Sequence, residues 1–239
     1  MPTEMVVTPR PPDGLRPGQI GVVMIGRVII GDIAATLADL SIRKLLQVEE
    51  TDTGAGVGSD WLLSPLLASA PRHRAESLLA YERTLLEELA GYGGAVRMQT
   101  LGRRVLDRTR DKLIGDAVHR GWVHRLHHDQ RTEAGTEVAR RIRAFQRDLR
   151  RLQAQGNAGA LTAELLPYAL HFGMARQDTP VLARFAHAFT ATFAGLEGWH
   201  PPAPQRPGPG QVDEALNKPS IDEQIMSPTV GMGVWLTGW

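Results

Sequence analysis

The chain has 239 residues, of which 42% are hydrophobic and 5% aromatic, enough for one large domain or two small ones. Its 27 basic and 26 acidic side chains leave a formal net charge of +1, which argues against a chain dedicated as a whole to nucleic-acid binding. No cysteine is present, so disulfides, thiolate catalysis and zinc–thiolate sites are excluded.

The N-terminal segment lacks the charged-then-apolar pattern of a signal peptide. The longest apolar run, residues 20–33, is interrupted by Arg27 and Asp32 and is shorter than the roughly 20 residues that a membrane-spanning helix needs. We therefore expect a cytoplasmic protein without a membrane span.

The first structured region predicts a winged-helix-like module over residues 15–70. A compact apolar helix leads into a second helix over residues 33–44, for which Asp32 is a suitable N-cap. Two strands follow, at residues 46–49 and 61–63, and the glycine-rich segment TDTGAGVGS between them is typical of a wing tip.

The next region predicts a second module of the same kind over residues 71–156. A leucine-rich helix at residues 76–90 ends at glycines, and Val96–Arg97 is expected as a short strand. A helical pair within residues 101–118 and a strand at residues 122–126 complete the repeat.

A long helix over residues 132–155 carries a narrow apolar seam at Val138, Ile142, Phe145, Leu149 and Leu152. The seam spans only about two heptads, whereas a coiled coil needs at least three. Packing onto its own domain is therefore favoured over an intermolecular coiled coil. A terminal helical pair is expected at residues 161–172 and 179–196.

The chain is thus predicted to be α+β and mostly helical, with two tandem winged-helix-like modules and a C-terminal helical pair. The expected parts are a disordered lead-in (1–14), the first module (15–70), the second module with its long helix (71–156), the helical pair (157–198), a Pro/Gly linker (199–210) and a peptide-like tail (211–239).

Several segments occur in an order that resembles a known family: LRPGQIGVVMIGRVIIGDIAATLADLSIRKLLQVEE, DWLLSP, YERTLLEEL, RGWVHR, AFQRDLRRLQ and LLPYALHFGMA. Over residues 15–194 the chain is similar to the C-terminal cytoplasmic half of the YciQ-like bacterial family, predicted membrane proteins of unknown function. The resemblance implies a winged-helix-like tandem and no catalytic residues. The chain departs from the family because it lacks the family's membrane-spanning segments and adds the linker and tail.

A basic cluster in the second module offers a nucleic-acid-binding hypothesis, since such side chains could contact phosphates from a helix-turn-helix. The cluster comprises Arg103, Arg104, Arg108, Arg110 and Lys112. Three aspartates are interleaved with it, so a solvated helix face is the alternative. Residues 131–151 hold seven arginines against three acidic residues, a local excess of +4 that also leaves an anionic partner open.

Four histidines, His119, His124, His127 and His128, lie close together in the sequence. A stable metal site needs three or four converging ligands, and the spacing here provides no acidic partner. We predict no metal and no cofactor, although the sequence does not exclude a metal at these histidines. No nucleophile or acid–base pair is apparent, so an enzyme is not expected.

The tail combines a capping box, Ser220 to Glu223, with the apolar end TVGMGVWLTGW. Its candidate partner anchors are Val234, Trp235, Leu236 and Trp239. The pattern is similar to the leader and core of ribosomally made peptide natural products, whose leaders are bound by winged-helix recognition elements. A terminus without a binding role is the equally weighted alternative.

The sequence therefore predicts a non-catalytic protein- or peptide-binding module, an adaptor or recognition protein, with a role in bacterial peptide natural-product biosynthesis as one setting. The tail would serve as ligand, anchor or regulatory arm, in cis or in trans. The alternative function is a DNA-binding winged-helix transcriptional regulator. The identity of the partner and the oligomeric state stay open.

Overall fold

The computed structural model describes residues 9–12, 14–52, 59–154, 162–174 and 180–196. Residues up to Phe193 form one compact unit, and a second unit begins at Ala194. Helices dominate the described part and accompany one small antiparallel sheet, so the predicted α+β, mostly helical class is confirmed. None of the described helices is both long enough and apolar enough to cross a membrane.

The described part of the chain contains α-helices, short 3₁₀ helices and three strands. In chain order they are η1 (Pro17–Gln19), α1 (Ile20–Ile25), α2 (Ile30–Ile42), β1 (Leu46–Asp52), β2 (Ser59–Pro65), α3 (Arg72–Glu76), α4 (Ala80–Ala90), β3 (Val96–Arg97), η2 (Met98–Thr100), α5 (Arg103–His119), α6 (Glu133–Ala154), η4 (Ala163–Leu165), α7 (Leu166–His171) and α8 (Pro180–Phe193).

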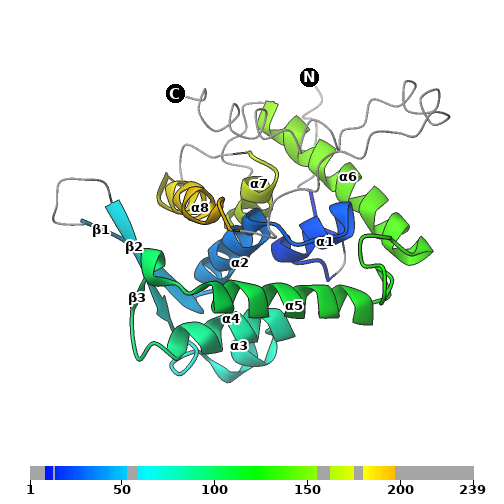
Figure 1. Cartoon of the computed structure of the whole chain (residues 1–239). Helices are drawn as coiled ribbons and strands as arrows, with labels where there is room; N and C mark the ends of the chain where they lie inside the picture. Colours follow the sequence, from blue (N-terminus) through cyan, green and yellow to red (C-terminus); the bar gives the residue numbers. More distant parts are fainter. Residues whose placement is uncertain (1–8, 13, 53–58, 155–161, 175–179, 197–239) are drawn as a thin grey trace, which may run out of the picture. The chain divides into compact units, whose positions relative to one another are not determined.

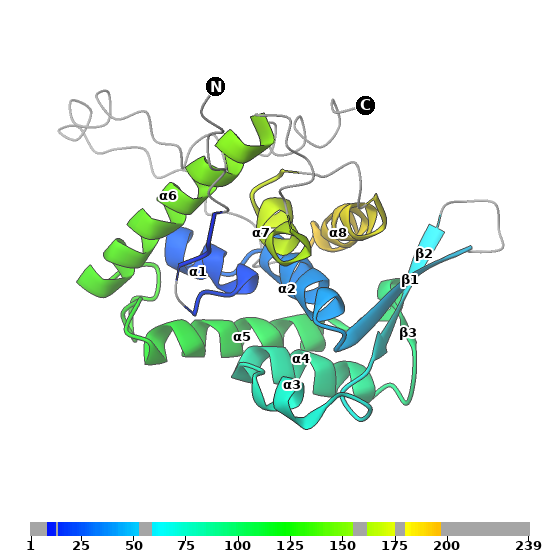
Figure 2. The same cartoon turned by 180° about the vertical axis from the view of Figure 1, so that it is seen from behind.

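Helix α2 is the centre of the unit and is contacted by η1, α7, α8 and β1. Figure 2 shows α7 and α8 beside it. Two glycines allow the preceding segment to approach α2 closely. A Cβ on Gly18 would lie 2.1 Å from the Thr36 hydroxyl oxygen, and one on Gly21 would lie 2.0 Å from a carboxylate oxygen of Asp32. No larger side chain fits at either position without a shift of α2.

The three strands form an antiparallel sheet in the order β1-β2-β3. Leu46 of β1 pairs with Pro65 of β2, and Leu63 of β2 pairs with Val96 of β3. The buried Trp61 of β2 packs edge-on against Phe185 of α8, with ring centroids 5.5 Å apart. Because β3 comes from the second predicted module and β1 and β2 from the first, one sheet is shared by both regions.

Helix α4 packs along α5 (Figure 1). The helix expected over residues 76–90 is present and ends at Ala90, but its start was placed too early: the chain forms α3, leaves the helical conformation and begins α4 at Ala80. The new start is favoured because the Glu82 carboxylate accepts the N–H of Leu79 at 2.9 Å.

Two further expectations for the second region are also wrong. The helical pair within residues 101–118 is one continuous helix, α5, preceded by the short turn η2. The strand at residues 122–126 is reduced to an isolated bridge between Val123 and Arg131. The chain turns back at once, since Thr132 donates its N–H to the Trp122 carbonyl at 3.1 Å.

Helix α6 buries four of the five residues of the predicted seam against its own unit, whereas Val138 is only half-buried. Phe145 contacts the rings of Tyr168 and Phe172, with centroids 5.4 and 6.3 Å away. The helix begins close to the end of α5, where a Cβ on Gly135 would lie 1.8 Å from the Trp122 carbonyl oxygen. These contacts support the preference for packing within the unit over an intermolecular coiled coil.

Candidate functional site

The partner anchors predicted from the tail lie outside the described residues. They are Val234, Trp235, Leu236 and Trp239. The described candidate groups belong to the first unit.

The predicted basic cluster lies on one helix, α5, but most of its charge is compensated there. Arg103 pairs with Asp107 at 3.2 Å, and Arg110 contacts Asp107 and Asp111 at 3.1 and 3.3 Å. Arg108 pairs with Glu88 of α4. These carboxylates therefore pair with the guanidinium groups that the nucleic-acid-binding hypothesis expected to contact phosphates.

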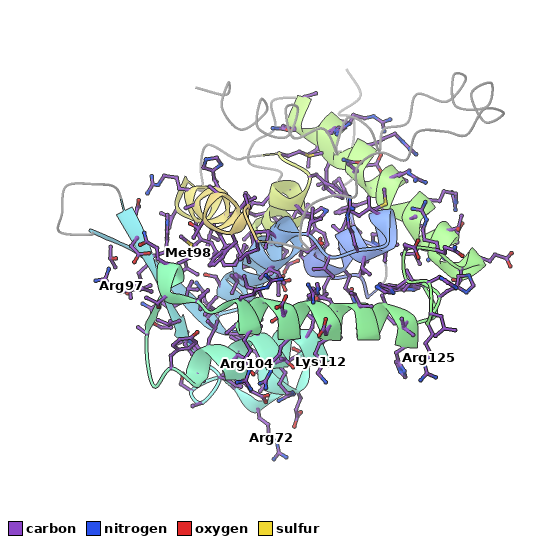
Figure 3. All side chains as sticks on the ribbon, in the orientation of Figure 1. Arg72, Arg97, Met98, Arg104, Lys112 and Arg125 are labelled. Atoms are coloured by element: carbon purple, nitrogen blue, oxygen red, sulfur yellow. The ribbon has the colours of Figure 1, made fainter. Side chains whose placement is uncertain are left out.

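The two other members of the cluster are exposed. Arg104 and Lys112 are labelled on α5 in Figure 3. Within the described ranges neither makes an ion pair. Two single charges are a weak basis for recognising a nucleic-acid duplex, since affinity depends on the number of phosphates neutralised.

The histidine cluster is spread over the end of α5 and the turn that follows. His119 closes α5, and His124, His127 and His128 are exposed in the turn, where the N–H of Gln130 is donated to the His127 carbonyl at 2.8 Å. No group of three or more potential metal ligands converges in the described part of the chain.

The expected role of Asp32 as an N-cap is wrong. Helix α2 begins at Ile30, which places Asp32 inside its first turn and fully buried. The carboxylate accepts the N–H of Ile29 at 2.8 Å and the N–H of Gly21 at 2.9 Å. It thereby satisfies one free donor of α2 and one of α1, and ties the two helices together.

Asp32 also meets a histidine that sequence reasoning did not single out. His171 at the end of α7 places Nδ1 3.2 Å from Asp32 Oδ1, with its side chain 8% exposed. Burial raises the pKa of Asp32 to about 8 and lowers the pKa of His171 to about 4. The pair therefore holds one proton between pH 4 and pH 8.

This pairing carries no net charge, and only the histidine reaches solvent, to a small extent. The position of Asp32 within an apolar run indicates a buried carboxyl group. Its partner, His171, lies 139 positions later, so only folding brings the two residues together. The Asp32 carboxyl itself is fully buried. We regard the pair as a structural joint between α1, α2 and α7.

A second buried polar cluster joins α2 to α4. Arg43 lies 2.9 Å from Asp39 and 2.8 Å from Glu82, whose side chain is 1% exposed. Burial lowers the pKa of Arg43, but the carboxylates of Glu82 and Asp39 outweigh that effect and raise it overall. Burial also raises the pKa of Glu82, and Arg43 opposes the rise.

The neighbouring Tyr81 is fully buried and its hydroxyl oxygen has no hydrogen-bond partner among the described residues. Burial, followed by the charges of Glu82 and Asp39, raises its pKa well above the ordinary value. Tyr168 instead donates its hydroxyl to the Leu15 carbonyl at 2.7 Å. Like the Asp32 pair, this cluster fixes helices and offers no accessible chemistry.

The accessible feature is the free edge of β1. The Leu66 N–H bonds to the Leu45 carbonyl at 2.9 Å, which sets the phase of the β1–β2 ladder. Since bonded pairs alternate in an antiparallel ladder, Gln47 and Glu49 direct their backbone groups to β2, and Val48 directs its N–H and C=O away from the sheet. No described residue bonds to those two groups of Val48. This edge is the candidate binding site.

Comparison with known proteins adds no relative to this description. No family model matches the chain, and neither a curated protein nor a solved structure is similar to it.

Proposed function

We propose that the protein is a non-catalytic protein- or peptide-binding module that adds an extended segment to the free edge of β1. The observation that carries the proposal is the outward N–H and C=O of Val48, which have no partner among the described residues. An extended peptide that pairs with such an edge gains main-chain hydrogen bonds, and side-chain contacts then provide selectivity.

The charges on β1 limit the kind of partner. Glu49 is exposed, and Glu50 pairs with Arg184 of α8 at 2.5 Å. Two copies of β1 placed side by side would bring acidic side chains together, which disfavours pairing between copies of this edge. A neutral or basic extended segment fits the edge better than an acidic one.

The C-terminal stretch TVGMGVWLTGW is the ligand that we propose first, because it is uncharged and carries Trp235 and Trp239 as potential anchors. Its likeness to a natural-product precursor peptide motivates the further proposal that the module acts in bacterial peptide biosynthesis, in the cytoplasm. A partner of the same chemistry from another protein would use the same edge.

The finer description of the fold also belongs to this proposal. The order α1, α2, β1, β2 supports a winged-helix-like first module, and the order α4, β3, α5 supports a second one that has lost most of its wing. Winged helices commonly act as docking modules, and the sheet shared between the two would keep the β1 edge rigid.

A labelled synthetic peptide of residues 226–239 tests the proposal by fluorescence anisotropy. The titrant is the full chain carrying Trp235→Ala and Trp239→Ala, so that its own tail does not compete. We expect the Val48→Pro variant to bind at least about fivefold more weakly, because proline removes an edge donor worth about 1 kcal/mol and leaves the β1–β2 ladder intact.

Val48→Thr is the matched control, since threonine keeps the N–H and the branched shape. A second control is the peptide with both tryptophans replaced by alanine, which should bind weakly. Equal affinity of the Val48→Pro and Val48→Thr chains, with both folded by circular dichroism, would refute the edge as the site. Lack of any binding by the parent chain would remove the tail as ligand.

The alternative function, a DNA-binding transcriptional regulator that reads DNA with α5, has less support. Three of its five proposed contacts already pair with carboxylates of α4 and α5. It would predict that Arg104→Ala and Lys112→Ala together abolish binding to a duplex at low salt.

A further inference from the structure

Helix α6 carries a row of arginines on the side opposite its buried seam. The row consists of Arg140, Arg143, Arg147 and Arg150. Each precedes a buried apolar residue, Ile142, Phe145, Leu149 or Leu152, by two positions. At 3.6 residues per turn, two positions correspond to about 200° around the helix. The arginines therefore lie on the side of the helix opposite the buried seam, where Arg140, Arg147 and Arg150 are exposed and Arg143 is half-buried.

The acidic residues of α6 lie off this row. Glu137 and Asp148 are displaced from it by about 100° or more around the helix, and Glu133 lies about 10 Å before its first member. Glu137 contacts Arg140 at 2.8 Å. Arg147 and Arg150 are exposed and make no ion pair with any residue in the described part of the chain.

The contrast with α5 is instructive because both helices are rich in arginine. On α5 the carboxylates stand three or four positions from the arginines on the same face and neutralise them. On α6 Glu137 compensates Arg140 in the same way, but no carboxylate stands three or four positions from Arg147 or Arg150, and these two arginines repel one another. Such an arrangement is costly for an isolated helix and suits an anionic partner.

We propose that the arginine row of α6 binds the phosphate backbone of nucleic acid without reading its sequence. The row extends over ten positions, about 15 Å, and presents up to four guanidinium groups at intervals of about 5 Å. Guanidinium groups bind phosphate oxygens through two parallel N–H donors. This surface is separate from the β1 edge and does not depend on the peptide-binding proposal.

The composition of the surrounding surface favours a polyphosphate over other anionic partners. The large apolar side chains Ile142, Phe145, Leu149 and Leu152 of α6 are buried within the unit, so no large exposed hydrophobic group accompanies the row into a bilayer, and stable membrane binding usually needs a second signal. An acidic protein partner would need a buried anchor for affinity, and no large exposed hydrophobic side chain lies on the described α6. Charge is the dominant feature that the row offers.

The test is binding of the full chain to a fluorescein-labelled 20-base-pair duplex of mixed sequence, followed by anisotropy at 50 and 200 mM NaCl. Four phosphate contacts predict that the association constant falls about 150-fold over this fourfold change in salt. In the variant Arg147→Ala with Arg150→Ala, two contacts are lost and the fall should shrink to about 12-fold. Binding at 50 mM NaCl should be correspondingly weaker.

The matched control is Arg104→Ala with Lys112→Ala on α5, which removes the same charge from exposed positions. It should retain the affinity and salt dependence of the parent chain. An equal loss in both variants would assign binding to net charge alone and overturn the proposal. Absence of duplex binding at 50 mM NaCl would also overturn it, as would tighter binding to vesicles containing anionic lipid or to polyglutamate than to the duplex.

Discussion

Asp32 of α2 and Glu82 of α4 occupy equivalent positions in two helices but differ in how their buried charge is compensated. Each lies three residues after the backbone N–H that it accepts, that of Ile29 or of Leu79. Asp32 faces His171, which is itself buried, and burial dominates and raises its pKa to about 8. Glu82 faces Arg43, whose charge opposes the effect of burial.

The same local capping interaction is therefore made by a protonated carboxyl group in Asp32 and by an ion-paired carboxylate in Glu82. Burial lowers the pKa of His171 and raises that of Asp32, so the proton of this pair resides on the carboxyl group. An arginine stays charged and supplies several donors, which allows it to hold Glu82 and Asp39 together. The stability contributed by the Asp32 pair depends on pH, and the stability contributed by the Glu82 cluster depends on the Arg43 cation.

Removal of that cation should have the largest effect. Arg43→Met leaves Glu82 and Asp39 buried without their main partner, which typically costs about 3–5 kcal/mol. For a unit of this size that corresponds to a melting temperature lower by about 6–20 °C. The defect should shrink at pH 5, since protonation of Glu82 removes the uncompensated charge.

Thermal unfolding followed by circular dichroism at pH 7 and pH 5 measures both effects. The control is Arg72→Met, which breaks the exposed Arg72–Glu76 pair and should cost less than about 1 kcal/mol. Similar losses in the two variants would mean that the Arg43 cluster is not the anchor of α4.

The second-largest loss of stability is expected when a side-chain atom is added next to Asp32. In Gly21→Ala the new Cβ would lie 2.0 Å from a carboxylate oxygen that two backbone donors hold in place, and we expect a loss of about 2–3 kcal/mol. Gly31→Ala is the matched control on α2. Its Cβ would meet only the side chain of Ile29, with Cδ1 at 3.6 Å and Cγ1 at 3.9 Å, so stability should rise by about 0.5–1 kcal/mol. Urea unfolding of both variants provides the comparison.

The pH dependence of the Asp32 joint follows from both pKa values. Folded Asp32, with a pKa of about 8 against an ordinary 3.8, keeps a proton that the unfolded chain releases, so its contribution falls as pH rises from about 4 to 8. Folded His171 has a pKa of about 4 against an ordinary 6.5, so it stays neutral where the unfolded chain binds a proton. Its contribution to the unfolding free energy therefore falls as pH drops from 6.5 to 4.

The two contributions cancel between pH 4 and 6.5, and only that of Asp32 acts between pH 6.5 and 8. The unfolding free energy of the parent chain should therefore lose about 2 kcal/mol over this upper window. Asp32→Asn should lose most of that slope, although it costs stability at every pH because its amide nitrogen cannot accept a backbone N–H. Urea unfolding at pH 6.5, 7.25 and 8 measures the slope; an unchanged slope in Asp32→Asn would contradict the assignment.

The smallest effect is expected at the rim of the Arg43 cluster. Ser77 Oγ accepts a 3.4 Å bond from Arg43 at an exposed position. Ser77→Ala should change stability by less than about 0.5 kcal/mol, because water replaces the hydroxyl. A loss comparable to that of Arg43→Met would place the serine, and not the carboxylates, at the centre of the cluster.

Local pattern was enough to predict several elements. The short strand Val96–Arg97 and the long helix with its seam at Ile142, Phe145 and Leu149 lie where the periodicity indicated. Predictions failed where a single side chain decides a boundary. Glu82 starts α4 late by accepting the N–H of Leu79, and Asp32 was assigned to the wrong side of the α2 terminus.

The sequence by itself determined the α+β, mostly helical class, the apolar faces and the exposed arginines of α6, because these depend on residue type and local spacing. Only the tertiary structure decided that Asp32 meets His171, that Arg43 meets Glu82, and that β3 joins the sheet of β1 and β2. Those pairings join residues far apart in the chain. Their protonation states follow from burial, a property of the packed molecule that no local pattern contains.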